Sequence, residues 1–194
     1  MLFSGRVYSV LIVSSSEKLN TVLKKLLPAS DYGPVRVVTS IAAAKREIVE
    51  RSYDFVVINT PLVDDFGDNF AIDISNKKDV VVMMLIKKEI YEEVHYKVVD
   101  QGVFTLPKPV STQIVEQALK WMASARERLR RMEKKSTSME ERMKEIRIVN
   151  HAKWLLIEKK QMTEAEAHRS IEKEAMDTGS TRRVIAERII AELE

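Results

Sequence analysis

The last third of the sequence carries the side chains best suited to binding a polyanion. The cations are Lys153, Arg169, Arg182 and Arg183, and the rings are His151, Trp154 and His168. Cationic side chains bind phosphates, and flat rings stack on unpaired bases. A solvated helix face explains Lys153 and Arg183 equally well. The apolar neighbours of Trp154 and His168 favour burial in a core, so we expect these two rings to be packed inside.

An acidic group in the first half offers a different chemistry. Asp64, Asp65 and Asp68 lie close together after an apolar run, and carboxylates are ligands for hard cations. A solvated acidic loop explains them more simply. The chain has no Cys and only three His, which excludes thiol catalysis and Cys-ligated zinc and leaves few ligands for a His-based metal site. It also has no phosphate loop and no Ser/His/Asp set, so we expect no enzyme activity, no cofactor and no metal.

Charge is distributed unevenly along the 194 residues. Residues 1–123 hold 15 basic and 15 acidic side chains, whereas residues 124–194 hold 17 and 14, so the net charge of +3 comes from the C-terminal part. This is a weak indication of a polyanionic partner. The longest apolar run, Val80 to Ile86, is too short to span a bilayer, and no secretory signal is visible. We therefore expect a cytoplasmic protein without a membrane partner.

The first half of the sequence alternates short apolar runs with helical spacing. The expected strands are Val7–Val13, Val35–Val38, Phe55–Ile58, Val80–Ile86 and Val103–Leu106, and the expected helices are Glu17–Leu27, Ile41–Arg51 and Ile90–Val99. Strands that are apolar throughout are buried on both faces, as in parallel sheets covered by helices. The pattern predicts an α/β doubly wound domain with any site at the carboxyl ends of its strands.

Residues 6–122 resemble the receiver domain of bacterial response regulators. The resemblance implies a flavodoxin-like fold with an acidic pair after the first strand, an Asp nucleophile after the third, a Ser or Thr after the fourth and a Lys before Pro after the fifth. At these places the chain has Ser14-Ser15, Asn59, Lys87 and Lys108-Pro109. Only the last part of the pattern remains.

These substitutions remove the chemistry of phosphoryl transfer. An Asn amide cannot form an acyl phosphate, and two Ser hydroxyls lack the charge to hold Mg²⁺, which dehydrates reluctantly. We therefore expect a degenerate phosphorylation site at Ser14, Ser15, Asn59 and Lys108. Two roles remain open for Lys108: hydrogen bonding to Asn59 and the Ser pair, or binding of an unknown anion.

One helical stretch connects the two halves of the chain. From Val115 to Asn150, apolar side chains recur in alternating steps of three and four residues, and nine of the eleven positions are apolar. Such spacing is typical of a coiled coil, although an amphipathic helix packed on its own chain would show it too. We predict a parallel homodimer. Its seam includes Met122, Leu129, Met132, Met139, Met143 and Ile146.

After the seam the sequence predicts a small unit of three helices. The apolar face continues to about Lys160, and Thr163 with Glu166 forms a capping box that starts the next helix. Gly179 suits the left-handed position that ends this helix. Ser180 or Thr181 then caps a last helix through Leu193.

The residues of this unit resemble the ANTAR domain, the RNA-binding output domain of response regulators that antiterminate transcription. The resemblance rests on the segments AKWLLI from Ala152, TEAEAH from Thr163, AMD from Ala175 and VIA from Val184. The chain departs from the family pattern at Trp154, Ile157, His168 and Ile185. The resemblance implies binding of paired hairpins in a nascent leader RNA. From residue type and position we expect the RNA contacts to come from His151, Lys153, Arg169, Arg182 and Arg183. We also expect a sensor or regulatory protein to act on the receiver.

We therefore expect a receiver-like domain at 1–112, a coiled-coil linker at 113–145 and an ANTAR RNA-binding domain at 146–194. Three alternatives are a DNA-binding regulator that uses Arg126 to Lys135 as a basic helix, a phosphotransfer module that uses His151, and a protein–protein adaptor. The acids mixed into the basic stretch argue against the first. His151 lacks an acidic neighbour in the sequence, which argues against the second.

Overall fold

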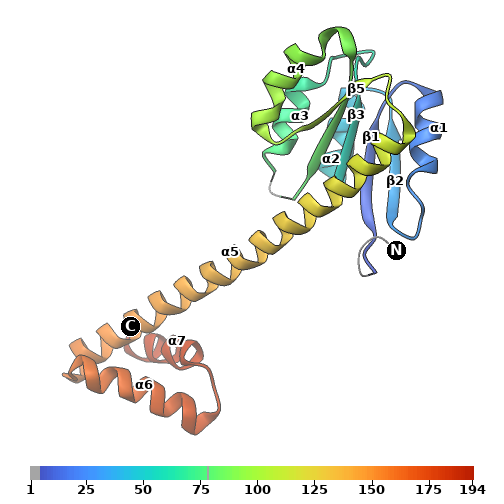
Figure 1. Ribbon diagram of the computed structural model, residues 1–194. Coiled ribbons are helices and arrows are strands. Elements are labelled where there is room, and N and C mark those ends of the chain that lie inside the picture. The colour runs from blue at the N-terminus through green and yellow to red at the C-terminus, as the bar shows by residue number, and fades with distance from the viewer. Residues whose placement is uncertain (1–4, 78) are drawn as a thin grey trace. The chain divides into compact units, whose positions relative to one another are not determined.

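The computed structural model describes residues 5–77 and 79–194 and divides into two compact units, Met1–Met132 and Glu133–Glu194 (Figure 1). The strands of the first unit are β1 Tyr8–Val13, β2 Tyr32–Val38, β3 Phe55–Asn59, β4 Val81–Lys87 and β5 Phe104–Lys108. Its helices are α1 Glu17–Lys25, α2 Ile41–Glu50, α3 Asp68–Ser75, α4 Tyr91–Val98 and the beginning of α5 Thr112–Lys160, with short 3-10 turns at Lys88–Ile90 and Val99–Gln101. No helix among the described residues combines the length and apolar character needed to cross a membrane.

The five strands form one parallel sheet in the order β2-β1-β3-β4-β5. This is the doubly wound order of flavodoxin-like domains, which confirms the predicted fold class. Val13 pairs with Ile58, and Asn59 pairs with Leu85, so the ends of β1, β3 and β4 lie side by side. Functional residues that follow these strands are thereby brought to one edge of the sheet.

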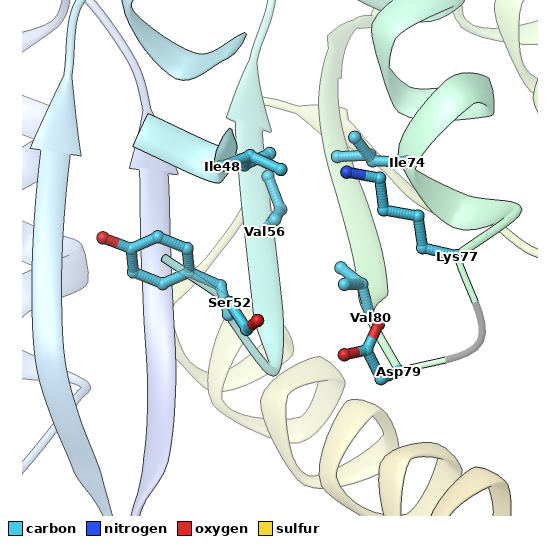
Figure 2. Close-up of a pocket in the computed structure, with 8 residues that line it drawn as sticks. Ile48, Ser52, Val56, Ile74, Lys77, Asp79 and Val80 are labelled. Atoms are coloured by element: carbon cyan, nitrogen blue, oxygen red, sulfur yellow. The ribbon is translucent and has the colours of Figure 1, made fainter. Parts of the chain in front are cut away.

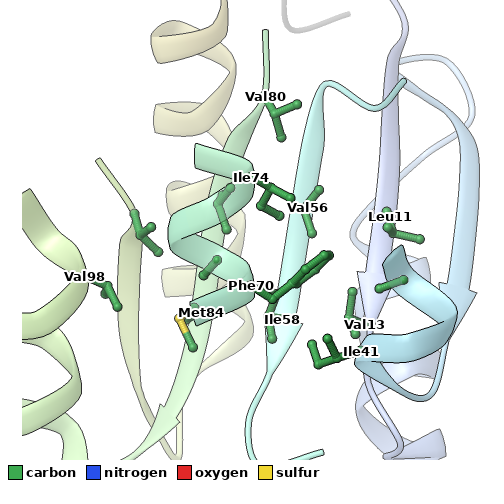
Figure 3. Close-up of a cluster of buried hydrophobic side chains, with 14 of the residues drawn as sticks. Leu11, Val13, Ile41, Val56, Ile58, Phe70, Ile74, Val80, Met84 and Val98 are labelled. Atoms are coloured by element: carbon green, nitrogen blue, oxygen red, sulfur yellow. The ribbon is translucent and has the colours of Figure 1, made fainter. Parts of the chain in front are cut away.

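Each face of the sheet has its own apolar core. One core packs α2, α3 and α4 against the sheet, with Phe70 among Val56, Ile58 and Ile41 (Figure 3). The other core packs α1 and α5 against the opposite face. β3 is buried at every position, as expected of a central parallel strand.

Helix α3 was not among the predicted elements. Its eight residues bury Phe70, Ala71 and Ile74 on one face, but the acidic residues before it gave the segment the character of a loop. Gly67 precedes the helix with φ +94°, and a Cβ there would lie 3.2 Å from Ile58. Glycine therefore provides both the left-handed backbone and the close approach of this turn.

The beginning of α5 belongs to the core of the first unit. Val115, Ala118 and Met122 are at most 3% exposed and pack on the sheet with Leu119, while Leu129 is partly buried against the same cluster. The predicted dimer seam is therefore wrong at its first positions, where the intrachain alternative holds. Residues 113–132, expected in the linker, belong to the first compact unit.

Ion pairs join this part of α5 to Asp54, the residue before β3. Arg126, 7% exposed, donates from Nε to Asp54 at 2.9 Å, and Arg130 reaches the same carboxylate at 3.3 Å. The other oxygen of Asp54 accepts from the backbone and hydroxyl of Ser9. Because Arg126 is buried in this bond, the basic helix of the DNA-binding alternative lacks its first cation.

A second group of contacts lies beside the first. Glu127 accepts from Arg6 at 2.6 Å and from the hydroxyl of Tyr8 at 3.1 Å. Burial would raise the pKa of Glu127, but the bonds from Arg6 and Tyr8 lower it below its usual value. Burial and the neighbouring Glu127 raise the pKa of Tyr8 to about 12.

The second unit contains the rest of α5, α6 Glu164–Thr178 and α7 Arg182–Leu193. Its core joins Ala152, Leu156, Ala167, Ile171 and Ile185 from the three helices. The predicted capping box is present: the Thr163 side chain accepts from the Glu166 backbone, and Glu166 accepts in return from the Thr163 backbone. Gly179 ends α6 with φ +62°, and Thr181 caps α7. The unit of three helices is confirmed.

Candidate nucleic-acid interface and altered receiver site

The carboxyl ends of β1, β3 and β5 hold a chain of hydrogen bonds. Lys108 donates from Nζ to Oδ1 of Asn59 at 2.6 Å, and Asn59 donates from Nδ2 to Oγ of Ser14 at 3.1 Å. Ser14 and Asn59 are buried. The predicted bond from Lys108 to Asn59 is present, and Ser14 is reached through Asn59. Ser15, in contrast, is exposed.

The ammonium of Lys108 is held by neutral oxygens. Besides Asn59, it donates to the backbone carbonyl of Thr60 at 2.5 Å. Burial lowers the pKa of Lys108, and the charge of Lys87 lowers it further. A neighbouring carboxylate would have the opposite effect on the pKa. This electrostatic environment disfavours a second cation such as Mg²⁺.

The three acidic side chains of the predicted acidic loop form hydrogen bonds and an ion pair within the first unit. Asp64 accepts from the backbone of Ile41 at 3.0 Å and of Ala42 at 2.9 Å, at the start of α2. Asp65 accepts from the backbone of Gly67, and Asp68 pairs with Lys97. Within the described part of the chain, no three acidic, His or Cys side chains gather as a metal site would require. Backbone hydrogen bonds and the pair with Lys97 therefore account for the positions of these three acids.

A small cavity lies at the opposite end of the sheet, before β3 and β4. Ile48, Val56, Ile74 and Val80 form its apolar walls, and Lys77 and Asp79 lie on its rim (Figure 2). Its volume of about 40 Å³ has room for a few water molecules. We assign it no ligand.

The second unit contains a groove of about 500 Å³. Its walls come from α5, α6 and α7, and the residues that line it are Arg142, Glu145, Ile146, Val149, Asn150, Lys153, His168 and Arg182. An adjoining hollow at the start of α6 shares Lys153 and His168 and adds Thr163, Glu164 and Ala165. The groove thus combines three cations, an imidazole and an amide, which suit phosphates and base edges.

The structure brings together two of the five predicted contact residues, Lys153 and Arg182. Arg183 pairs with Glu187 at 2.8 Å; this bond raises the pKa of Arg183, and the charges of Glu145 and Glu141 raise it further. His151 and Arg169 are exposed but are not among the residues that line the groove.

Two expectations about rings were wrong, and one cation was missed. Trp154 is 55% exposed and the His168 side chain 47% exposed, so neither is a core residue. Ala152, Leu155 and Leu156 fill the buried side of α5 and leave Trp154 on another. Arg142 was assigned only to the outer face of the coiled coil. Its distance of eleven residues from Lys153, three helical turns, could have placed both on one face.

Carboxylates accompany the cations of this unit. Lys153 pairs with Glu164 at 3.3 Å, and Arg182 lies 3.7 Å from both Glu145 and Glu172. The Arg182 pairs are exposed and contribute roughly 0–1 kcal/mol each, so a phosphate can replace the carboxylate at small cost. The cations are therefore positioned by the fold and remain available to a stronger anion.

A protein family matches part of the second unit, and solved structures share the fold of the first. The protein-family model of the ANTAR domain matches residues 137–190. A comparison with curated proteins finds no match.

Solved structures resemble the first unit. The signal receiver domain of an HD domain-containing protein from Pseudomonas fluorescens is 20% identical with a TM-score of 0.57, over 66% of this chain and 95% of that one. A response regulator receiver domain protein from Clostridium thermocellum is 18% identical with a TM-score of 0.55, over 65% and 99%. The regulatory domain of the repressor of iron transport regulator, RitR, is 23% identical with a TM-score of 0.53, over 61% and 97%. At these identities the likeness concerns the fold. The chain therefore carries an ANTAR domain at residues 137–190, preceded by a domain with the fold of response-regulator receivers.

Proposed function

We propose that this chain is an RNA-binding transcription antiterminator of the response-regulator type, active in the cytoplasm, where nascent transcripts are found. Its C-terminal unit binds paired hairpins in a leader RNA and thereby disfavours a terminator hairpin. The observation that carries the proposal is the groove within the ANTAR domain, where Arg142, Lys153 and Arg182 meet beside His168. An unpaired RNA loop exposes phosphates, which bind cationic side chains, and bases, which stack on rings.

In a parallel homodimer two such grooves lie beside the seam, because Ile146 and Asn150 belong to both. Along α5, from the last residue of the first unit onward, the seam residues Met132, Met139, Met143 and Ile146 are each at least 50% exposed. An exposed apolar stripe with coiled-coil spacing is typical of a self-association surface. Asn150 continues this stripe at a position where a polar side chain fixes register.

The altered receiver site supports regulation without aspartyl phosphorylation. Lys108, Asn59 and Ser14 satisfy one another, so a signal at this domain would come from a sensor or regulatory protein that contacts its surface. The adaptor alternative shares this feature. It differs in predicting that the groove has no RNA ligand.

Titration of RNA at several salt concentrations tests the proposal. The probe is a labelled leader RNA with two hairpins, compared with a DNA duplex of equal length. Binding should weaken with salt, with a logarithmic slope of about 0.7 for each phosphate contact to single-stranded RNA. The Arg182→Ala/Arg183→Ala variant should bind more weakly and with a smaller slope.

Arg188→Ala is the matched control. Arg188 is an exposed cation on α7 that pairs with Glu174 and Glu192 and does not line the groove, so its loss should change the slope little. Coinciding curves for wild type and the double variant would show that Arg182 and Arg183 are solvated surface. Equal affinity for the DNA duplex would replace the RNA proposal with DNA binding.

A further inference from the structure

The heptad positions of α5 determine which side chains of a partner would face the groove. With Met143 and Asn150 at position a and Ile146 at position d, Lys135, Arg142 and Val149 occupy position g. In a parallel pair, each g residue lies beside the e residue five positions later on the other helix. Arg142 and Val149, which line the groove, would therefore lie beside residues 147 and 154 of the second chain.

One pair of charges suits the parallel register. Lys135 at g would lie beside Glu140 of the partner subunit at e, an attractive pair. The exposed apolar stripe of Met139, Met143 and Ile146 makes a second copy of this chain the occupant. The parallel register is the one proposed above.

At the groove the two facing side chains carry like charges instead of opposite ones. Arg142 would lie beside Arg147 of the partner subunit, which places two cations together at the groove wall. Like charges at this position repel each other in the free dimer and are stabilised when a polyanion binds. The repulsion is thus confined to the ligand-binding end of the seam.

Trp154 is a large ring that its own chain leaves exposed. It is 55% exposed, and His151 is its neighbouring ring at 6.4 Å with the planes tilted by 40°. Trp154 occupies position e, and the position opposite is Val149, a partly buried residue of the groove wall. Val149 packs against the core of its own unit and also lines the groove.

We propose that each groove is a composite site, completed by Trp154 of the partner subunit. The indole stacks on an unpaired base, while Lys153 and Arg182 of the first chain hold the flanking phosphates. This rests on the RNA binding and the dimer proposed above and adds which chain supplies the stacking ring. The ligand it specifies is an RNA loop with an unstacked base, because paired bases offer no free face.

Subunit complementation tests the composite site. Two variants are made, Trp154→Ala and the groove variant Lys153→Ala/Arg182→Ala, and each is purified as a homodimer and, with two different tags, as a mixed dimer. The probe is a fluorescein-labelled single hairpin selected by wild type from a pool with a randomised loop. Loss of a stacking ring should raise the Kd of the Trp154→Ala homodimer roughly 5- to 150-fold.

The mixed dimer separates the two arrangements. If the ring acts on the partner's groove, one site has both its groove and its ring intact, and the mixed dimer binds one hairpin with wild-type Kd. If the ring acts on its own chain, both sites are damaged and the mixed dimer binds no better than the homodimers. The second result overturns the proposal, as does an unchanged Kd for the Trp154→Ala homodimer.

Fluorescence provides an independent measurement. In a Trp121→Phe background, the only indole of the mixed dimer is the Trp154 of the groove-variant chain. Quenching of this indole by the hairpin, with half-saturation at the Kd of the intact site, supports the proposal, and unchanged emission at saturation contradicts it. Sedimentation confirms that each variant is still a dimer. A wild type that selects no hairpin would contradict the proposed function itself, an outcome distinct from a complementation failure.

Discussion

At the scale of single residues, the altered receiver site is defined by hydrogen bonds in place of charges. Asn59 accepts from Lys108 and donates to Ser14, so both groups of its amide are used. A carboxylate at position 59 would pair with Lys108. The end of β1 would still carry the uncharged Ser14 and Ser15, where a Mg²⁺ site needs carboxylates. A single substitution therefore restores the nucleophile without the metal site.

We predict that neither wild type nor Asn59→Asp forms an aspartyl phosphate. The physical reason is that Mg²⁺ requires carboxylates at the carboxyl end of β1, where the chain has Ser14 and Ser15. Incubation with acetyl phosphate and Mg²⁺, followed by intact-mass spectrometry, measures the adduct. The Ser14→Asp/Ser15→Asp/Asn59→Asp variant regains both the acidic pair and the nucleophile, so it is the variant in which we expect an adduct. An adduct on the wild type at this domain would refute the expectation.

Two buried tyrosines predict how stability changes at high pH. Burial raises the pKa of Tyr8 and of Tyr53 from 10.0 to about 12. Since the folded pKa lies above the unfolded one, their contribution is complete below pH 10 and is lost as the pH rises from 10 to about 12. Urea unfolding across this interval should show a falling free energy of unfolding. Tyr8→Phe should reduce the fall, whereas Tyr96→Phe at an exposed position should leave it unchanged.

At the scale of elements, the capping box of α6 was predicted from Thr163 and Glu166 alone, and the structure contains it. We expect Thr163→Ala to lower the free energy of unfolding by about 1 kcal/mol, because a backbone N–H at the start of the helix loses its acceptor. Thermal unfolding measures the change. Thr163→Ser keeps the hydroxyl and should restore most of the stability. Equal destabilisation by both variants would indicate that packing of the Thr methyl matters instead.

The exposed seam gives a second prediction for an element. Met139→Glu/Met143→Glu places like charges opposite each other in a parallel pair and should cost several kcal/mol, so the dimer should dissociate. Thr137→Glu/Lys144→Glu adds two acids at outward positions of the same helix and is the matched control. Sedimentation at micromolar concentration measures the mass. A wild type with the mass of one chain would end the dimer proposal.

The sequence predicted the sheet well because its strands are apolar throughout. It missed α3 because eight residues beside an acidic loop give a weak periodic signal. It misassigned the beginning of the seam for another reason: the spacing from Val115 to Met122 is the same whether the helix packs on its own sheet or on a partner. Periodicity identifies an apolar face but not what covers it.

The groove could be predicted only in part for a similar reason. Lys153 and Arg182 were identified by residue type, whereas Arg142 and His168 were assigned to other roles. Their meeting depends on how α5, α6 and α7 pack, which no local pattern records. Trp154 was expected in the core because of its apolar neighbours, although those neighbours face another side of the helix.

At the scale of the whole molecule, two grooves in one dimer predict avidity. A leader RNA with two hairpins should bind the dimer more tightly than one hairpin does, by a factor on the order of 10²–10⁴ when the spacing allows both to engage. The Met139→Glu/Met143→Glu variant should bind either RNA with similar affinity. Titration with linkers of different length measures the effect. A dimer that binds one and two hairpins equally would show that its grooves act separately.

The seam is rich in methionine rather than leucine, so oxidation of its thioethers can weaken the proposed dimer. Met132, Met139 and Met143 are exposed in the single chain and would be covered in the dimer. Oxidation converts each thioether into a polar sulfoxide, which weakens an apolar interface. Mild peroxide should therefore modify these methionines faster in dilute protein than in concentrated protein, as peptide mass spectrometry can measure. The modified chains should re-associate poorly until a reductase restores the thioether, so oxidant stress would reduce the number of paired grooves.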